Sequence, residues 1–141
     1  MFGTSNDEAK YIITGNNRDI NRYRWNEKNI INLVKNKKTK QSIFYKSITN
    51  LLDIRRKQKA FHPNALRSNI NINSKIFCFK RVSIDGKQTV ICITNLSSKA
   101  QNMKLKKKYQ KWKNLIGPRL KFGKNNLYSM TPFQTIWLSN I

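Results

Sequence analysis

Acidic residues are scarce in this sequence of 141 residues: six Asp and Glu stand against 29 Lys and Arg, which gives a net charge of +23. Two cysteines without CxxC spacing exclude a disulfide scaffold and a cysteine-rich metal site, so we expect no metal and no cofactor. No run approaches the ~20 apolar residues that cross a bilayer. Residues 1–7 lack the basic and apolar regions of a secretory signal, so we expect a cytoplasmic protein without membrane partners.

The excess of positive charge has two explanations. A strongly basic protein often binds nucleic acid. However, 21 of the basic residues are Lys and only eight are Arg, beside 19 Asn and 17 Ile. Lys, Asn and Ile are specified by AT-rich codons, whereas a selected phosphate-binding surface favours Arg. We interpret the charge as compositional and do not expect a nucleic-acid partner. A small basic nucleic-acid-binding module is the alternative function.

Two helices are predicted in the first half of the chain. Residues 1–24 have little periodicity and are expected to form a loop. Apolar residues after Trp25 predict a short amphipathic helix, with Asn26 as its N-cap. The stronger helical pattern runs over Ile43–Arg55, where apolar residues recur every three or four positions, and Pro63 prevents its continuation. Two helices are too few to bury that apolar stripe, so this half is expected to need a partner.

The second half has the pattern of β-strands. Lys75–Ile84 and Lys87–Thr94 flank an Asp-Gly pair at 85–86, which favours a hairpin with a two-residue type I′ turn. That register makes Cys78 and Cys92 point to opposite faces of the sheet, so no disulfide is expected. Shorter strands follow, separated by Gly and Pro, and together they favour an antiparallel sheet or sandwich. These strands are predicted at Gln101–Lys107, Trp112–Ile116, Asn126–Ser129 and Phe133–Leu138.

Four sequence segments, in order, carry a resemblance to a known family. They are Asn6-Asp7 followed by Thr14-Gly15-Asn16-Asn17-Arg18-Asp19-Ile20-Asn21-Arg22, then Leu51–Ala65, Val90–Ser97 and Leu127–Leu138. The set resembles the C-terminal portion of the sucrose phosphorylase-like enzymes of glycoside hydrolase family 13, in the α-amylase superfamily. The segment Leu51–Ala65 is similar to the branch that uses phosphorylated sucrose or glucosylglycerate.

The resemblance implies a fold and a division of the chain. The fold class is α+β: the end of a (β/α)8 barrel, seen as a loop plus two helices, followed by a small antiparallel β-sandwich. Residues 1–66 would be the remnant of the catalytic barrel, with its last active-site loop and final helices. Residues 67–141 would be the C-terminal antiparallel β domain.

The resemblance also implies a function in carbohydrate metabolism. The family uses retaining chemistry, which requires an Asp nucleophile and a Glu acid/base, and phosphate attacks the glucosyl-enzyme. None of the six acidic residues matches those positions, so no catalytic residue is assigned. We expect a truncated part of an α-glucosyl phosphorylase that is inactive alone. Its partners would be a sugar or phosphosugar and inorganic phosphate in a full-length context, or a complementing N-terminal fragment.

One binding residue is implied by the resemblance. Arg18 corresponds to an Arg of the family's glucose subsite, where a guanidinium can hold a carboxylate and sugar hydroxyls together. Its acidic partner in the family is not found in this sequence. Ala9 replaces a Glu that is usual near this motif, and Glu8 precedes it, which puts the shape of the loop in doubt.

Other notable residues have simpler interpretations. The one histidine, His62, lies before Pro63 at a helix exit and is expected to cap or pack. The run 104–108 is rich in Lys and is expected to form an edge strand, with a binding patch as the alternative. Aromatic residues of the strands are expected in the core, with a sugar- or base-stacking platform as the alternative; they are Phe77, Phe79, Trp112, Phe133 and Trp137.

Overall fold

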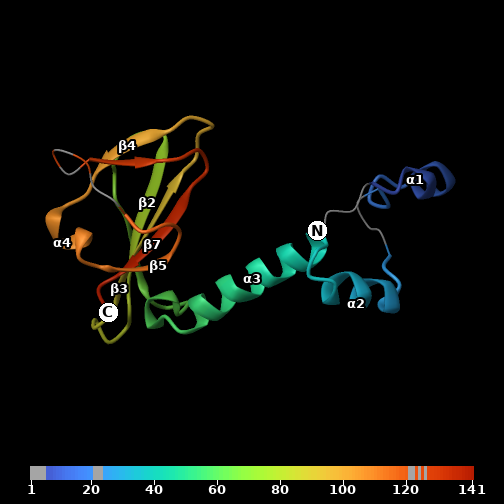
Figure 1. The fold of residues 1–141 in the computed structure, drawn as a ribbon, viewed down its shortest axis with the longest axis horizontal. Coiled ribbons are helices and arrows are strands. Elements are labelled where there is room, and N and C mark those ends of the chain that lie inside the picture. Colours follow the sequence, from blue (N-terminus) through green and yellow to red (C-terminus); the bar gives the residue numbers. More distant parts are fainter. Residues whose placement is uncertain (1–5, 21–23, 121–122, 124, 126) are drawn as a thin grey trace. The chain divides into compact units, whose positions relative to one another are not determined.

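The computed structural model describes residues 6–20, 24–120, 123, 125 and 127–141 (Figure 1). The described residues form two units, the first ending at Leu52 and the second comprising Asp53–Ile141. The first unit contains helices, and the second contains two antiparallel sheets with short helices. The α+β class with an antiparallel β part is therefore confirmed.

A helix stands where the sequence led us to expect a loop. α1 spans Glu8–Thr14; the side chain of Asp7 accepts a hydrogen bond from the Lys10 N–H at its start. Gly15 ends the helix with a φ of +63°, a left-handed conformation that glycine adopts without strain. The predicted loop over residues 1–24 is thus wrong at α1. Seven residues make too few turns for an apolar period to be visible, although Asp7 and Gly15 are typical end signals.

The other two helices of the first half lie where they were predicted. α2 spans Glu27–Lys35, and the Asn26 side chain accepts from the Asn29 N–H, as expected of an N-cap. α3 spans Lys40–Arg56, which includes the predicted range, and begins with a hydrogen bond from the Ser42 N–H to the Thr39 hydroxyl. Several apolar side chains of α3 remain exposed: 58% for Ile43, 41% for Ile48 and 49% for Leu52.

The larger sheet has five antiparallel strands in the order β1-β2-β3-β7-β5, and a two-stranded sheet pairs β4 with β6.

The predicted strand at 101–107 is too long, because β4 ends at Lys104 and α4 begins at Lys107. β1 was not predicted. The strand expected from Asn126 begins at Leu127, and Asn126 itself lies outside the described residues. The bounds are β1 Leu66–Asn69, β2 Ile76–Val82, β3 Thr89–Asn95, β4 Gln101–Lys104, α4 Lys107–Gln110, β5 Lys113–Ile116, β6 Leu127–Met130 and β7 Thr135–Ser139.

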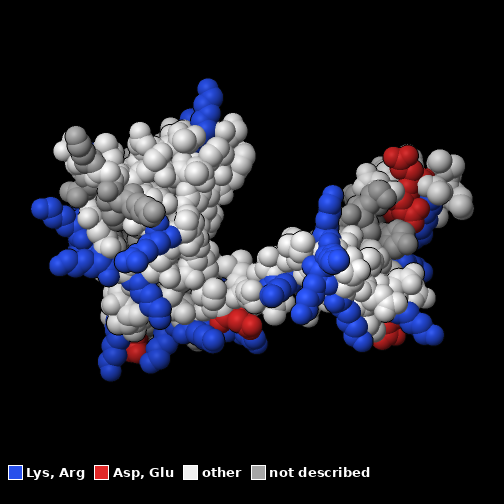
Figure 2. Space-filling model, in the orientation of Figure 1, with Lys and Arg blue, Asp and Glu red and all other residues white. Residues whose placement is uncertain are grey.

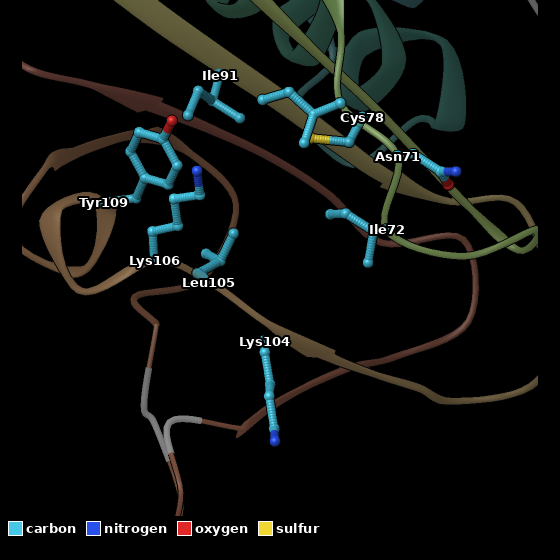
Figure 3. Close-up of a pocket in the computed structure, with 9 residues that line it drawn as sticks. Asn71, Ile72, Cys78, Ile91, Lys104, Leu105, Lys106 and Tyr109 are labelled. Carbon is cyan, nitrogen blue, oxygen red and sulfur yellow. The ribbon is translucent and has the colours of Figure 1, made fainter.

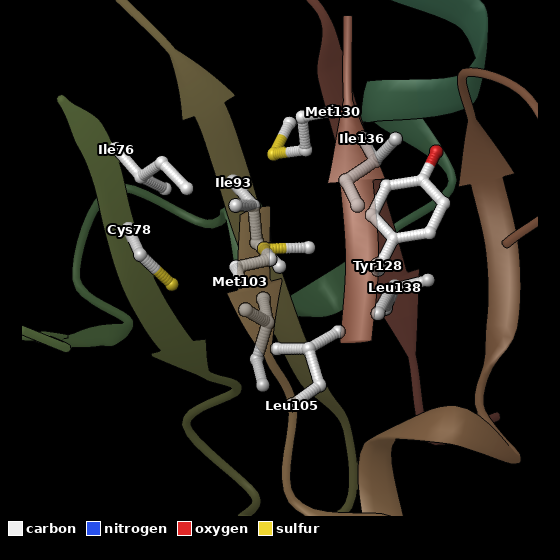
Figure 4. Close-up of a cluster of buried hydrophobic side chains, with 10 residues drawn as sticks. Ile76, Cys78, Ile93, Met103, Leu105, Tyr128, Met130, Ile136 and Leu138 are labelled. Carbon is white, nitrogen blue, oxygen red and sulfur yellow. The ribbon is translucent and has the colours of Figure 1, made fainter. Parts of the chain in front are cut away.

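The two sheets enclose the main core. Figure 4 shows side chains of the small sheet and of the segment after β4 facing those of β2, β3 and β7. Such alternating burial on β6 and β4 is what a two-layer sandwich requires. The buried members of this core are Ile76, Cys78, Ile91, Ile93, Met103, Leu105, Tyr128, Met130, Ile136 and Leu138.

The other face of the large sheet is covered by a short turn that comes after α3. This turn, η1 (Lys59–Phe61), places Ala60 and Phe61 against Val90 and Cys92 of β3. The rings of Phe61 and Trp137 lie 4.7 Å apart. β3 is therefore buried on both faces, which explains its continuous apolar run.

The central hairpin has the predicted register but a different turn. Val82 pairs with Thr89, and Cys78 lies opposite Ile93, so the two buried, free cysteines do face opposite sides. The Gly86 N–H bonds to the Ser83 carbonyl, and of the turn residues Gly86 alone has a positive φ. The two-residue type I′ turn is wrong; the loop contains four residues, 84–87, between the paired Ser83 and Gln88.

On the face seen in Figure 2, basic side chains lie at separate places on the second unit and along α3. They do not form one stripe there. This distribution favours the compositional explanation of the charge. Among the described residues, no helix is long and apolar enough to cross a bilayer.

Candidate functional site

The candidate site inferred from the sequence is the turn at the end of α1. Its shape is set by a small polar network around Asp19. The Thr14 hydroxyl donates to Asp19 Oδ2 at 2.8 Å, and Lys10 Nζ lies 3.2 Å from Asp19 Oδ1. The hydrogen bond from Thr14, followed by that from Lys10, lowers the pKa of the Asp19 carboxyl. The ionised carboxylate therefore fixes the turn to the helix from which it leaves.

Backbone groups of the turn are also satisfied locally. The Asn16 side-chain oxygen accepts from the Arg18 N–H at 3.0 Å, and the Asn16 carbonyl accepts from the Asp19 N–H at 2.9 Å. The Asp7 N–H donates to the Ile20 carbonyl at 2.9 Å, which joins the two ends of the segment. Thr14, Gly15, Asn16 and Asp19 thus all have a structural role in the motif.

Arg18 differs from its neighbours because its side chain has no structural role. It is exposed, and its guanidinium forms no hydrogen bond or ion pair within the described part of the chain. A rigid turn that presents an unpaired guanidinium suits the binding of a carboxylate or of sugar hydroxyls. The remaining motif residues, Asn21 and Arg22, lie outside the described residues.

The acidic residues do not form a hydrolytic site. Asp7 caps α1, Asp19 holds the turn, Asp53 pairs with Arg56, and Asp85 organises the hairpin loop. The two carboxyls with a resolved shift, those of Asp19 and Asp85, both have a lowered pKa, whereas a general acid needs a raised one. The two glutamates are exposed in the first turns of their helices. No metal-binding cluster of His, Cys, Asp and Glu occurs among the residues that were placed.

A second polar arrangement, which the sequence did not reveal, fastens η1 to the large sheet. Gln88 Oε1 accepts from the Ala60 N–H at 3.0 Å, and its Nε2 donates to Gln58 Oε1 at 2.7 Å. Arg81 donates from Nε to the Ala60 carbonyl at 2.8 Å and from a terminal nitrogen to the His62 carbonyl at 2.7 Å. These bonds fix the segment between α3 and β1, and no local sequence pattern signals them.

The remaining candidates have mainly structural positions. His62 Nδ1 accepts from the Asn64 N–H, as expected of a cap. Trp112 and Trp137 pack against the two cores, and Phe79 is half-buried, whereas Phe77 and Phe133 are exposed. The aromatic residues therefore only partly agree with the core prediction. In the run 104–108, which was expected to be an edge strand, buried Leu105 comes directly after β4 and two of the lysines begin α4.

No protein-family model matches the sequence. The glucosylglycerate phosphorylase of Spirochaeta thermophila is 26% identical over 97 residues, which are 69% of this chain and 16% of that protein. The glucosylglycerate phosphorylase of Escherichia coli is 29% identical over 103 residues, 73% of this chain and 18% of that protein. Among solved structures, trehalulose synthase MutB from Pseudomonas mesoacidophila MX-45 superposes with a TM-score of 0.54 at 18% identity, covering 77% of this chain and 19% of that one. The α-glucosyl transfer enzyme XgtA superposes with a TM-score of 0.52 at 14% identity, covering 67% of this chain and 17% of that one.

The chain resembles the C-terminal portion of the sucrose phosphorylase-like enzymes of glycoside hydrolase family 13. This confirms the resemblance seen in the motifs. The chain spans less than a fifth of the length of the phosphorylases it matches. Sugar-active relatives give no support to the nucleic-acid-binding alternative.

Proposed function

We propose that this chain provides the C-terminal part of a retaining α-glucosyl phosphorylase. The observation that carries the proposal is sequence similarity to two glucosylglycerate phosphorylases over about 70% of the chain. In such an enzyme, residues 1–66 belong to the end of the catalytic barrel and residues 67–141 form the β domain behind it. The substrates are a glucoside and inorganic phosphate, in a cytoplasmic setting.

The catalytic carboxylates of that enzyme are not among the six acidic residues of this chain. The aspartates have structural partners, and both resolved shifts keep carboxyls ionised. Retaining cleavage needs one carboxyl that stays protonated until it donates to the leaving group. The chain by itself is therefore inactive.

Arg18 is the residue that this part contributes to the glucose subsite. The support is its exposed guanidinium, which has no partner among the residues that the structure describes, on a turn held by Thr14 and Asp19. A carboxylate from the remainder of the enzyme orients the guanidinium, which then binds sugar hydroxyls.

Exposed apolar residues supply the surface against which the rest of the barrel packs. Phe44, Ile48 and Leu52, which follow one another at four-residue spacing along one face of α3, are all more than 40% exposed. A hollow between α2 and α3 adds further apolar surface, lined by Ile30, Ile31, Val34, Lys35 and Tyr45. Contiguous apolar surface of this kind marks an interface.

The test begins with the purified chain, phosphate, and either sucrose 6-phosphate or glucosylglycerate. No glucosyl phosphate should form. Adding the upstream part of a glucosylglycerate phosphorylase, without its own matching C-terminal part, should produce co-purification and phosphorolysis. Arg18→Ala should then reduce kcat/KM by at least about tenfold, the effect of one charge-assisted hydrogen bond. Arg119→Ala, an exposed Arg of the β part, is the matched control.

Three results would contradict the proposal. Turnover by the purified chain alone would show that its own acidic residues suffice. Failure of the two parts to co-purify would remove the proposed interface. Equal kcat/KM for Arg18→Ala and Arg119→Ala would remove Arg18 from the subsite.

A further inference from the structure

A hollow enters the β unit between its two sheets and reaches the main core. Its volume is about 330 Å3, within the range of small-molecule sites. At its inner end lie Ile91, which is fully buried, and Cys78, which is 3% exposed. Ile72 is half-buried and Leu105 is 8% exposed, and both are labelled in Figure 3. Its apolar lining consists of Ile70, Ile72, Cys78, Ile91 and Leu105.

Two polar groups stand together at one side of this hollow. Figure 3 shows the ammonium of Lys106 directed toward the ring of Tyr109 and Ile91, whereas the side chain of Lys104 points away. Within the described residues, Lys106 has no ion pair and the Tyr109 hydroxyl makes no hydrogen bond. The ring of Tyr109 is held in place by Trp112, whose centroid lies 4.9 Å away. A cation and a hydroxyl donor therefore adjoin an apolar cavity.

We propose that this hollow binds the anion of a straight-chain carboxylic acid. The carboxylate accepts from Lys106 and from the Tyr109 hydroxyl, and the alkyl chain extends toward Ile91 and Cys78. No acidic side chain lines the described hollow, so an anion is favoured over an amine. A sugar is disfavoured because most lining side chains cannot form hydrogen bonds.

Binding at this site is non-covalent. Burial raises the pKa of the Cys78 thiol to about 12, so the thiol stays protonated and is a poor nucleophile. The ligand is therefore retained by the hydrophobic effect on its alkyl chain and by the charge of its carboxylate. This site is independent of the proposed phosphorylase function.

The experiment compares butyrate, hexanoate and octanoate by calorimetric titration of the whole chain. The Kd should fall about fourfold for each added methylene, the factor expected when a CH2 group leaves water. Hexanol should bind at least about tenfold more weakly than hexanoate, because it lacks the charge that Lys106 recognises. NMR signals of the Ile91 methyl groups should shift on binding.

Variants of two lysines separate a specific site from general attraction to a basic protein. Lys106→Met should weaken hexanoate binding at least about tenfold and leave hexanol unchanged. Lys104→Met, which removes the same charge from a neighbouring side chain that points away, should bind as the unchanged protein does. Tyr109→Phe should weaken hexanoate by about threefold and gives a second test if Lys106→Met fails to fold. The proposal is overturned if affinity does not depend on chain length, if both lysine variants lose equal affinity, or if the Ile91 signals stay fixed.

Discussion

The side chain of Gln88 accepts a hydrogen bond from the backbone N–H of Ala60, 28 residues earlier, at 3.0 Å. Both residues are buried, and the same amide also donates to Gln58 and Ser139. One side chain thus joins the end of the helical segment to the hairpin and to the last strand. This contact should control whether η1 stays on the sheet.

Gln88→Leu should lower the free energy of unfolding by about 2–3 kcal/mol, because the buried Ala60 N–H loses its acceptor. Denaturant unfolding followed by tryptophan fluorescence measures the change, since Trp137 lies beside η1. Gln101→Leu is the control: it loses one partly buried bond to the Ser97 hydroxyl, leaves no buried backbone group without a partner, and should cost less than about 1 kcal/mol. Equal losses in the two variants would remove Gln88 from this role.

Gly117→Ala should destabilise the β unit far more than Gly86→Ala. Both glycines have a positive φ, which costs other residues about 1–2 kcal/mol. At Gly117 a Cβ would also lie 2.5 Å from the Thr135 carbonyl oxygen and 2.7 Å from Ile136 Cγ2, whereas Gly86 has open space. We expect the free energy of unfolding to fall by about 3 kcal/mol or more for Gly117→Ala and by about 1 kcal/mol for Gly86→Ala, measured by denaturant unfolding. Similar values would contradict the close approach of β7.

The carboxyl of Asp85 should titrate with a pKa of about 2, below its ordinary 3.8, because the Ser83 hydroxyl and then the Lys87 N–H donate to it. A lowered pKa in the folded state stabilises the fold above 3.8, and this contribution is lost as the pH falls toward about 2. Carboxyl NMR titration measures the midpoint. Ser83→Ala should raise the pKa more than Lys59→Ala does, since the Lys59 bond contributes less. The opposite order would show that the ion pair dominates.

The two cysteines should be unreactive in the folded protein. Burial raises the pKa of Cys78 and of Cys92 to about 12, and thiolate is the reactive form. A colorimetric disulfide reagent at pH 8 should label neither cysteine until denaturant is added, when both should react. Rapid labelling of native protein would contradict the burial, and a disulfide under mild oxidation would contradict their placement on opposite faces.

Elements with a regular pattern or a local end signal were predicted best from the sequence. The register of β2 and β3 came from centring the hairpin on Asp85-Gly86, and α2 came from the apolar residues after Trp25 with Asn26 as its N-cap. The turn type was not predictable in this way. The side chains of Ser83 and Asp85 accept hydrogen bonds from the backbone N–H groups of Gln88 and Lys87. These bonds stabilise a wider loop and depend on the folded geometry.

Long-range contacts account for most of what was missed. η1 covers the second face of β3 through Gln88 and Arg81, and neither residue belongs to a local pattern. α1 was missed because it is short. For Arg18, the motif located an exposed guanidinium without a partner in the described part of the chain, and its role in a glucose subsite stays a prediction.

The last strand of the chain occupies an inner position in the large sheet. β7 lies between β3 and β5, and its Ile136 pairs with Ile93 of β3. During synthesis, β3 therefore keeps one row of backbone groups without a neighbour until β7 has been made. A chain that lacked β7 would leave that row open to other polypeptides and would be prone to aggregation.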